Sequence, residues 1–289
     1  MIHGFLKACT VSPALRVADC AFNTQQTIAA MQRAAADGVK LAVLPELGLT
    51  GYTCGDLFFQ QPLQRAAARG LAAVLEASAD LDLVALVGLP VTVDGKLYNC
   101  AAVVCHGKLL GLVPKTYLPN YGEFYERRQF NPAPAGVRTL HFAGQEVPFG
   151  TQLLFRCAEM PEFCLGVEVC EDLWAPLPPS THHALAGATV IANLSASDET
   201  IGKADYRRAL VSQQSARLLC AYLYAYAGHG ESTTDMVFAA HDLICENGTL
   251  LSEAKPFGAG YACTELDLGR MVSERCRSTT FRLENTGYA

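Results

Sequence analysis

Short apolar runs alternate with longer amphipathic runs along most of this chain. Runs with the length and apolar composition of buried strands occur at 4–11, 41–44, 83–91, 164–169, 189–193, 220–226 and 261–267. Apolar residues recur at helical spacing over 19–37, 56–78 and 204–219, and a further helix is expected after Pro179, ending near Ala186. Hairpins are predicted over 97–113 and around Asn247-Gly248, the second beside apolar segments at 236–241, 243–245 and 249–252. This alternation predicts a layered α/β domain, and the hairpins indicate mixed rather than purely parallel sheets.

Composition excludes several classes of protein. Apolar residues make up 51% of the 289 residues and charged residues 17%, which supplies a large core and too little charge for disorder. The net charge is −6 and no basic run occurs, so the electrostatic signature of a nucleic-acid binder is missing. No run of about 18 apolar residues is present, and the N-terminus lacks the features of a signal peptide. We therefore expect a cytoplasmic protein with no nucleic-acid or membrane partner. Because no repeat or linker is visible, 1–289 is predicted to be one domain.

The twelve cysteines are expected to be reduced thiols. None forms a C-x-x-C pair, and a chain of this size and apolarity does not need disulfides to fold. Cysteine packs as a small hydrophobic residue, so most of these side chains are expected to be buried.

Three strand-like runs end in a reactive side chain. LAVLPELGLTGY supplies Glu46, LLGLVPKTYLPNYGEFYERRQF supplies Lys115, and CLGVEVCEDLW supplies Cys170. Taken singly, a buried Cys, a turn after a strand and a surface Lys are all common structural features. Open α/β sheets place ligand sites at strand ends, however, and a carboxylate can take a thiol proton while a lysine stabilises a thiolate and an oxyanion. Glu171 and Asp172 would disfavour a thiolate, so their side chains are expected to point elsewhere or to be neutralised.

The sequence motifs in these segments resemble those of a known family. PELGLTGY, PKTYLPNYGEFYE and GVEVCEDLW are similar to the three catalytic segments of the nitrilase (carbon–nitrogen hydrolase) superfamily. NLSASDETIGKADYRR and YAGHGESTTDMVF narrow the resemblance to the N-terminal glutaminase domain of glutamine-dependent NAD⁺ synthetases. The resemblance runs from about Phe5 to about Phe281. It implies an α-β-β-α sandwich, in which two mixed sheets pack face to face between helices.

The resemblance also implies roles for individual residues. Cys170 would be the nucleophile, Glu46 the general base, and Lys115 the cation that stabilises the oxyanion together with the backbone N–H of Glu171. Glu126 is favoured as the accessory acid that orients the lysine and the base, with Glu123 as the nearby alternative. The substrate pocket would comprise Tyr121, Phe124, Glu171, Trp174, Ser197 and Lys203. Tyr121 would face the amino-acid end of glutamine, and Ser197 with Lys203 would hold its α-carboxylate. Several relatives carry Arg where Lys203 stands, and Lys lacks the bidentate fork of Arg.

The implied activity is a cysteine amidohydrolase that acts on L-glutamine without a metal or organic cofactor. The ammonia would serve the amidation of deamido-NAD by an ATP-pyrophosphatase synthetase domain, in cis or in trans. That domain would use ATP, but its S-G-G-x-D-S type loop does not occur in these residues. The resemblance further implies a homo-oligomer. Two alternatives are another carbon–nitrogen hydrolase, such as an ω-amidase or carbamoylase, and a catalytically silent assembly or regulatory module.

Other motifs are interpreted as structural. His182-His183 could be a metal pair, but adjacent histidines without further ligands are usually structural or solvated. The glycine-rich GHGES segment, Gly228–Ser232, matches no nucleotide-binding loop and is interpreted as a turn near the site. No G-x-S-x-G motif occurs, which disfavours a serine hydrolase of the α/β type.

Overall fold

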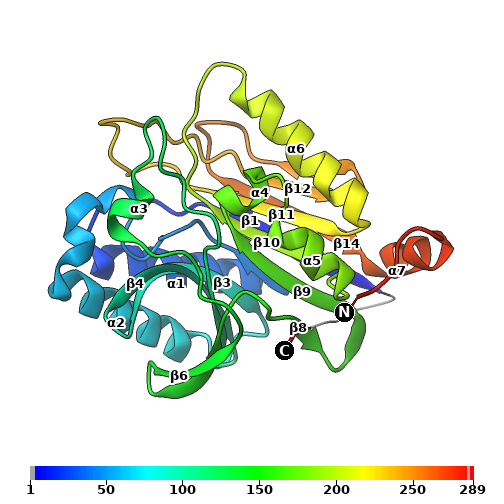
Figure 1. Cartoon of the computed structure of the whole chain (residues 1–289), viewed down its shortest axis with the longest axis horizontal. Coiled ribbons are helices and arrows are strands. Elements are labelled where there is room, and N and C mark those ends of the chain that lie inside the picture. Colours follow the sequence, from blue (N-terminus) through cyan, green and yellow to red (C-terminus); the bar gives the residue numbers. More distant parts are fainter. Residues whose placement is uncertain (1–3, 285–286) are drawn as a thin grey trace.

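Two mixed β-sheets pack against each other in the computed structural model, which describes residues 4–284 and 287–289 (Figure 1). The first sheet has eight strands in the order β14-β1-β2-β3-β4-β5-β7-β6. These strands are β1 (Phe5–Val11), β2 (Leu41–Val43), β3 (Val84–Val93), β4 (Lys96–Cys105), β5 (Lys108–Pro114), β6 (Arg138–Phe142), β7 (Gln145–Phe149) and β14 (Tyr261–Asp267). The second sheet has six strands in the order β13-β12-β11-β10-β9-β8. They are β8 (Phe155–Cys157), β9 (Met160–Val169), β10 (Val190–Ser195), β11 (Ala221–Tyr226), β12 (Leu243–Glu246) and β13 (Thr249–Glu253). The predicted arrangement of two mixed sheets flanked by helices is confirmed.

Helices cover the outer face of each sheet. The helices are α1 (Cys20–Ala36), a 3₁₀ helix η1 (Tyr52–Phe59), α2 (Gln61–Ala77), α3 (Glu126–Gln129), α4 (Glu171–Trp174), α5 (Pro179–Leu185), α6 (Lys203–Leu218) and α7 (Leu268–Arg277). Met31 of α1 and Val74 of α2 share one apolar cluster with the first sheet. Ala184 of α5 and Val211 of α6 share another with the second sheet. The central strands of each sheet, such as β3, β4, β10 and β11, are thus buried on both faces, which explains why they appear as continuous apolar runs.

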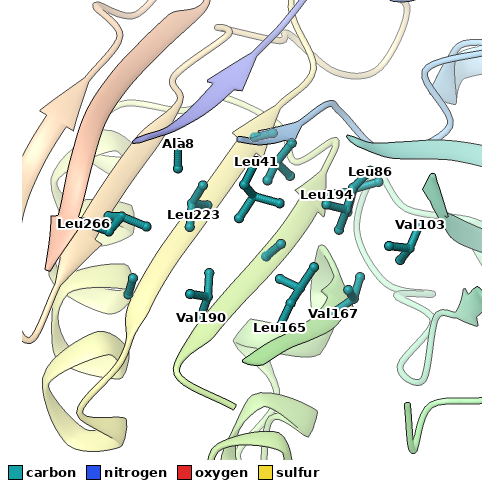
Figure 2. Close-up of a cluster of buried hydrophobic side chains, with 14 of the residues drawn as sticks. Ala8, Leu41, Leu86, Val103, Leu165, Val167, Val190, Leu194, Leu223 and Leu266 are labelled. Atoms are coloured by element: carbon teal, nitrogen blue, oxygen red, sulfur yellow. The ribbon is translucent and has the colours of Figure 1, made fainter. Parts of the chain in front are cut away.

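The core lies between the two sheets. Leu41, Leu86 and Val103 from the first sheet meet Leu165 and Leu194 from the second (Figure 2). Successive side chains of β10 point to opposite faces, so its residues divide between this core and the layer under the helices. The parallel strands β9, β10 and β11 run side by side, so their carboxyl ends lie at one edge of the second sheet.

Several expected elements differ in the structure. Residues 56–59 belong to the 3₁₀ helix η1, and the α-helix predicted from 56 begins only at Gln61. Gly55 has a φ of 54° and interrupts η1, while Pro62 suits the first turn of α2. The segment 236–241 forms no strand. The β6–β7 hairpin, β8 and α7 were not predicted: the strands are only three to five residues long, and α7 buries only Leu268 and Met271. Within the described ranges, none of the helices combines the length and hydropathy that a bilayer-spanning helix needs.

Candidate active site

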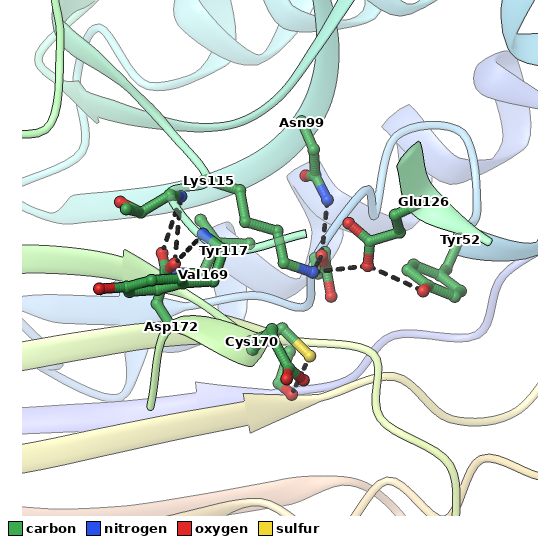
Figure 3. A network of polar contacts seen from close by, with 12 residues as sticks. Tyr52, Asn99, Lys115, Tyr117, Glu126, Val169, Cys170 and Asp172 are labelled. Carbon is green, nitrogen blue, oxygen red and sulfur yellow. Dashed lines mark hydrogen bonds and ion pairs between the residues drawn. The ribbon is translucent and has the colours of Figure 1, made fainter. Parts of the chain in front are cut away.

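The structure brings Glu46, Lys115 and Glu126 together in one buried ion cluster. Glu46 lies just after β2, Lys115 directly follows β5, and Glu126 opens α3. The Nζ atom of Lys115 is 2.7 Å from Oε1 of Glu46 and 2.6 Å from Oε1 of Glu126 (Figure 3). The Lys115 and Glu46 side chains are fully buried, and Glu126 is almost so. Glu126, the favoured one of the two candidate acids, is therefore the one that pairs with Lys115. Glu123 instead lines a cavity of about 150 Å³ beside Tyr52 and Glu126.

The charges in this cluster depend on one another. Burial alone would lower the pKa of Lys115, but the carboxylates of Glu126 and Glu46 outweigh burial and raise its pKa well above the usual value. Lys115 is therefore an ammonium. Burial raises the pKa of Glu126, although the Lys115 charge and the hydrogen bonds from Lys115 and Tyr52 oppose that shift. Removing any one partner would leave a buried charge without compensation.

One oxygen of each carboxylate is left available. Oε1 of Glu46 accepts hydrogen bonds from Lys115 and from Nδ2 of Asn99, the latter at 2.5 Å. Oε1 of Glu126 accepts from Lys115 and from the hydroxyl of Tyr52 at 2.8 Å. Within the described residues, the buried Oε2 atoms of Glu46 and Glu126 have no hydrogen-bond partner. A buried, unpaired carboxylate oxygen beside a thiol is well suited to accept a proton.

Cys170 occupies a sharp elbow between β9 and α4. Its φ of 45° and ψ of −99° are unusual for a residue with a side chain and cost about 1–3 kcal/mol. The backbone N–H donates to the Leu194 carbonyl at 2.9 Å and to Oδ1 of Asn193 at 3.0 Å. These contacts with β10 fix the elbow, so the thiol is held at the carboxyl edge of the second sheet.

The Cys170 thiol is neutral at rest. Burial and then the negative charge of Glu46 raise its pKa, and this outweighs the opposite effect of Lys115. The hydroxyl of Ser195 donates to Sγ at 3.2 Å, and Ser195 also lies 2.6 Å from the hydroxyl of Tyr224. A thiol with a raised pKa needs a base to become a nucleophile. Glu46 is the charged group that influences this thiol most strongly.

Asp172 ties the Lys115 segment to the Cys170 elbow. Its carboxyl group accepts backbone hydrogen bonds from Tyr117 at 2.8 Å, Val169 at 3.0 Å and Thr116 at 3.1 Å (Figure 3). Burial raises the pKa of Asp172 to about 8, against the effect of these hydrogen bonds. Asp172 thus faces backbone amides, as the sequence argument required of an acid next to a reactive thiol.

Most of the predicted pocket residues contact one another around Glu171, which directly follows Cys170 in the chain. The hydroxyl of Tyr121 donates to Oε1 of Glu171 at 2.6 Å, and the Tyr121 and Phe124 rings are 6.0 Å apart. The Nζ atom of Lys203 lies 5.4 Å from the Trp174 ring and 5.9 Å from the Phe124 ring. Glu171 is also the first residue of α4, so its N–H has no acceptor within the helix.

The segment after β10 adds a charged pair to the pocket. Lys203 forms an ion pair with Asp198, and the neighbouring Ser197 is buried. Two aromatic faces, an ammonium and a carboxylate thus lie in one neighbourhood. Such a set is chemically suited to a polar ligand that carries its own charges.

Sequence reasoning missed several residues around this cluster. Tyr52 was inside the quoted PELGLTGY segment, and Asn99 is a lone amide in the apolar run of β4. Asn193, Ser195 and Tyr224 sit on strands whose side chains were expected only to pack. The signal that could have found Asn99 is its polarity, because a buried amide is retained only where it is hydrogen-bonded.

His183 is structural rather than a metal ligand. Its ring nitrogens contact the Val167 carbonyl and the Tyr288 hydroxyl, both at 3.0 Å. Burial lowers its pKa to about 4, so the ring stays neutral. Among the residues that the structure describes, no group of three His, Cys, Asp or Glu side chains is arranged to hold a metal ion.

Comparisons with known proteins identify the family of this chain. The family model described as "Carbon-nitrogen hydrolase" matches residues 8–275. The chain is 44% identical over 281 residues to the glutamine-dependent NAD(+) synthetase of Mycobacterium tuberculosis, covering 96% of this chain and 41% of that protein. The chain thus spans less than half the length of this curated relative.

Solved structures show the same similarity. A glutamine-dependent NAD(+) synthetase from Cytophaga hutchinsonii superposes with a TM-score of 0.80 at 27% identity, covering 90% of this chain and 42% of that one. A carbon-nitrogen hydrolase from Helicobacter pylori G27 has the same fold, with a TM-score of 0.76 at 17% identity over 94% of this chain and 93% of that one. The predicted resemblance is confirmed, and the chain belongs to the carbon–nitrogen hydrolase family.

Proposed function

We propose that this chain is a cysteine amidohydrolase that releases ammonia from the side-chain amide of L-glutamine. The observation that carries the proposal is the buried Glu46–Lys115–Glu126 cluster beside the Cys170 elbow. The similarity to glutamine-dependent NAD(+) synthetases supports glutamine as the nitrogen donor.

The first half of the reaction forms a thioester. Glu46 takes the Cys170 proton on its free Oε2, and Sγ attacks the amide carbon of the substrate. The Lys115 ammonium and the Glu171 N–H stabilise the negative charge that develops on the amide oxygen. Glu46 then transfers its proton to the departing nitrogen, the carbon–nitrogen bond breaks, and ammonia leaves a γ-glutamyl thioester on Cys170.

The second half regenerates the enzyme. Glu46 takes a proton from water, and the resulting hydroxide attacks the thioester carbon. The carbon–sulfur bond breaks, glutamate is released, and the Cys170 thiolate recovers the proton from Glu46. Lys115 stays charged throughout, because its pKa is held high by the two carboxylates. This half-reaction uses no metal or organic cofactor.

The pocket proposed for the amino-acid end of glutamine combines Tyr121, Glu171, Lys203 and Ser197. Lys203 and Ser197 would hold the α-carboxylate, while Glu171, which accepts a hydrogen bond from Tyr121, directly follows Cys170 in the chain. Phe124 and Trp174 flank the Lys203 ammonium and limit its contact with water. A carboxylate bound there would replace lost hydration with a charge-assisted hydrogen bond.

The ammonia would be used by an NAD synthetase domain that amidates deamido-NAD with ATP, in cis or in trans. The relatives support this, because they are glutamine-dependent NAD(+) synthetases and this chain matches only 41% of their length. Cytoplasmic location and homo-oligomeric assembly are part of the same proposal.

The test is release of glutamate and ammonia from L-glutamine by the wild-type chain and by Cys170→Ala. Turnover that Cys170→Ala abolishes without loss of the fold supports the proposal, and activity retained in that variant refutes it. If the wild type is silent alone, addition of a synthetase domain separates a switched-off glutaminase from another carbon–nitrogen hydrolase or a non-catalytic module. Turnover of ω-amides or carbamoyl amino acids in place of glutamine would replace the proposed substrate.

A further inference from the structure

The GHGES segment contacts the active-site framework through Glu231. One carboxylate oxygen of Glu231 accepts the backbone N–H of Tyr52 at 2.6 Å. The other accepts both the N–H of Thr53 at 3.0 Å and its hydroxyl at 2.5 Å. The Ser232 N–H donates back to that hydroxyl at 2.9 Å. Glu231 therefore fixes the start of η1 from a loop that is remote in the sequence.

Tyr52 extends this connection to the ion cluster. Its backbone is held by Glu231, and its hydroxyl donates to Glu126 at 2.8 Å. Glu126 in turn accepts from Lys115 at 2.6 Å. The Tyr52 ring is almost fully buried and meets the edge of the Phe238 ring at a centroid distance of 6.1 Å. This packing restricts the ring, so the position of the Tyr52 backbone helps to set where the hydroxyl points.

Backbone geometry shows that the loop is built to approach this place. Gly230 has a φ of 110°, and a Cβ atom there would lie 1.8 Å from the Leu15 carbonyl oxygen. Leu15 also donates its N–H to the His229 carbonyl at 3.1 Å. Only glycine allows such a close approach, which places Glu231 next to the start of η1.

From these contacts we infer that Glu231 is a positioning residue, which aims the Tyr52 hydroxyl at Glu126 and thereby holds Lys115 in place for the reaction. The inference rests on the proposed function. Among the described residues, Glu231 makes no hydrogen bond with Cys170 or with the predicted pocket residues. Its hydrogen bonds go to Tyr52 and Thr53, and the charge of Glu46 also acts on it. The turn at Gly228–Ser232, which the sequence analysis interpreted as lying near the site, would thus serve to position Tyr52.

A double-mutant cycle between Glu231→Gln and Tyr52→Phe tests this inference. In Glu231→Gln the new side chain places an NH₂ group against the N–H donors of Tyr52 and Thr53, so it no longer holds their backbone. We expect kcat for glutamine to fall about tenfold at unchanged KM, the scale of a lost hydrogen bond to a charged group. In the Tyr52→Phe background the same change should have little further effect, because the hydroxyl that it positions is gone. Additive losses, or a wild-type kcat in a folded Glu231→Gln variant, would overturn the inference.

Matched variants separate positioning from loss of the fold. Glu246 also accepts a backbone N–H, from Asp267 at 2.7 Å, but it pairs with Ala221 at the start of β11, away from Cys170. Glu246→Gln should keep the wild-type kcat. If Glu231→Gln does not fold, Thr53→Val removes the hydroxyl that Glu231 binds, and Thr53→Ser should restore activity. Failure of Thr53→Ser to restore what Thr53→Val loses would count against the inference.

A pH profile gives a readout that a purely structural role would not move. Glu126 faces Lys115, Glu46 and Tyr52, and the Tyr52 hydrogen bond lowers its pKa. Loss of that bond raises the pKa of Glu126, so the acid limb of kcat/KM should shift to higher pH in both Glu231→Gln and Tyr52→Phe. An unchanged acid limb in Glu231→Gln would contradict the inference.

Thiol alkylation distinguishes failure of this inference from failure of the proposed function. The rate of Cys170 modification by iodoacetamide needs no glutamine turnover, and the exposed Cys276 serves as an internal reference. Three results together support the positioning role even if glutamine is not the substrate. Cys170 is labelled more slowly in Glu231→Gln, Cys276 is labelled at the wild-type rate, and adding Glu231→Gln to Tyr52→Phe slows Cys170 no further. Equal labelling of Cys170 in the wild type and Glu231→Gln would refute it.

Discussion

The Nζ atom of Lys115 lies 2.7 Å from Oε1 of Glu46, and neither side chain is exposed to solvent. The two residues are 69 positions apart in sequence, so only the fold brings them into contact. Because Lys115 also pairs with Glu126, a single ammonium compensates two buried carboxylates. This arrangement fixes the position of the proposed base, Glu46, relative to the Lys115 ammonium before any substrate binds.

Lys115→Met tests the electrostatic role of the ammonium. Methionine keeps an unbranched apolar side chain but leaves two buried carboxylates unpaired, so we expect about 3–5 kcal/mol lower unfolding free energy at neutral pH. Loss of the cation raises the pKa of Glu126 further, because Lys115 is the strongest influence that lowers it. Stability should therefore be retained in acid and decline as the pH rises from about 4.5, the ordinary Glu value, through the raised folded-state pKa. Urea unfolding across pH measures this, and a pH-independent difference from the wild type would contradict it.

Asp172→Asn tests the connection between the two halves of the site. The amide can accept fewer of the N–H groups that Asp172 now binds, so about 1–3 kcal/mol of stability should be lost. Because the freed segments carry Lys115 and Cys170, kcat should fall more than KM changes. Thermal melts and steady-state kinetics on the same samples would show this. A variant that loses stability but keeps kcat would show that the Asp172 hydrogen bonds only stabilise the fold.

Gly88→Ala tests how closely the backbone that carries Glu46 is packed. A Cβ atom on Gly88 of β3 would lie 2.3 Å from the Leu47 nitrogen and 2.6 Å from the Pro45 carbonyl oxygen. The Glu46 segment must therefore move, and we expect kcat to drop by at least about tenfold. Val74→Ala, which removes buried methyl groups from α2 away from the site, is the control for loss of stability alone. Similar kcat losses in both variants would point to general loosening of the fold instead.

Lys203→Ala tests the predicted carboxylate clamp. We expect KM for glutamine to rise by about tenfold or more with little change in kcat, because Lys203 is proposed to bind a part of the substrate that does not react. Propionamide, which has no α-carboxylate, provides the comparison, and Lys203→Ala should leave its turnover unchanged. An equal loss with both amides would show that Lys203 shapes the pocket rather than binding a carboxylate.

The sequence predicted the sheet layers and the residues Glu46, Lys115 and Cys170, because each of these features is visible within a single short segment. Buried strands such as β3 appear as continuous apolar runs, and the motifs around Glu46, Lys115 and Cys170 carry those residues at strand ends. Tyr52 and Asn99 were missed for a different reason. Their importance depends on which side chain lies opposite them across the site, and the pattern of a single segment does not contain that information.

The misplaced elements have a similar explanation. Each strand of the β6–β7 hairpin has five residues, and only Val147 and Phe149 of β7 are buried, so the alternation is too short to stand out in the sequence. In α7 the apolar residues Leu268, Met271 and Val272 lie at helical spacing, but the helix has only ten residues and buries only the first two of these. Residues 56–59 do lie in a helix, but they form the end of the 3₁₀ helix η1, which Gly55 interrupts with a φ of 54°.

The elements that carry the site come from both sheets. Glu46 and Lys115 follow strands of the eight-stranded sheet, whereas Cys170 follows a strand of the six-stranded sheet, and the apolar core is the layer between them. A small slip of one sheet over the other would separate the Cys170 thiol from Glu46, its proposed base, while leaving every strand and helix intact. Heat inactivation of the enzyme should therefore begin below the temperature at which circular dichroism detects melting. The apolar contacts of the interior thus set the working temperature of the chemistry as well as the stability of the fold.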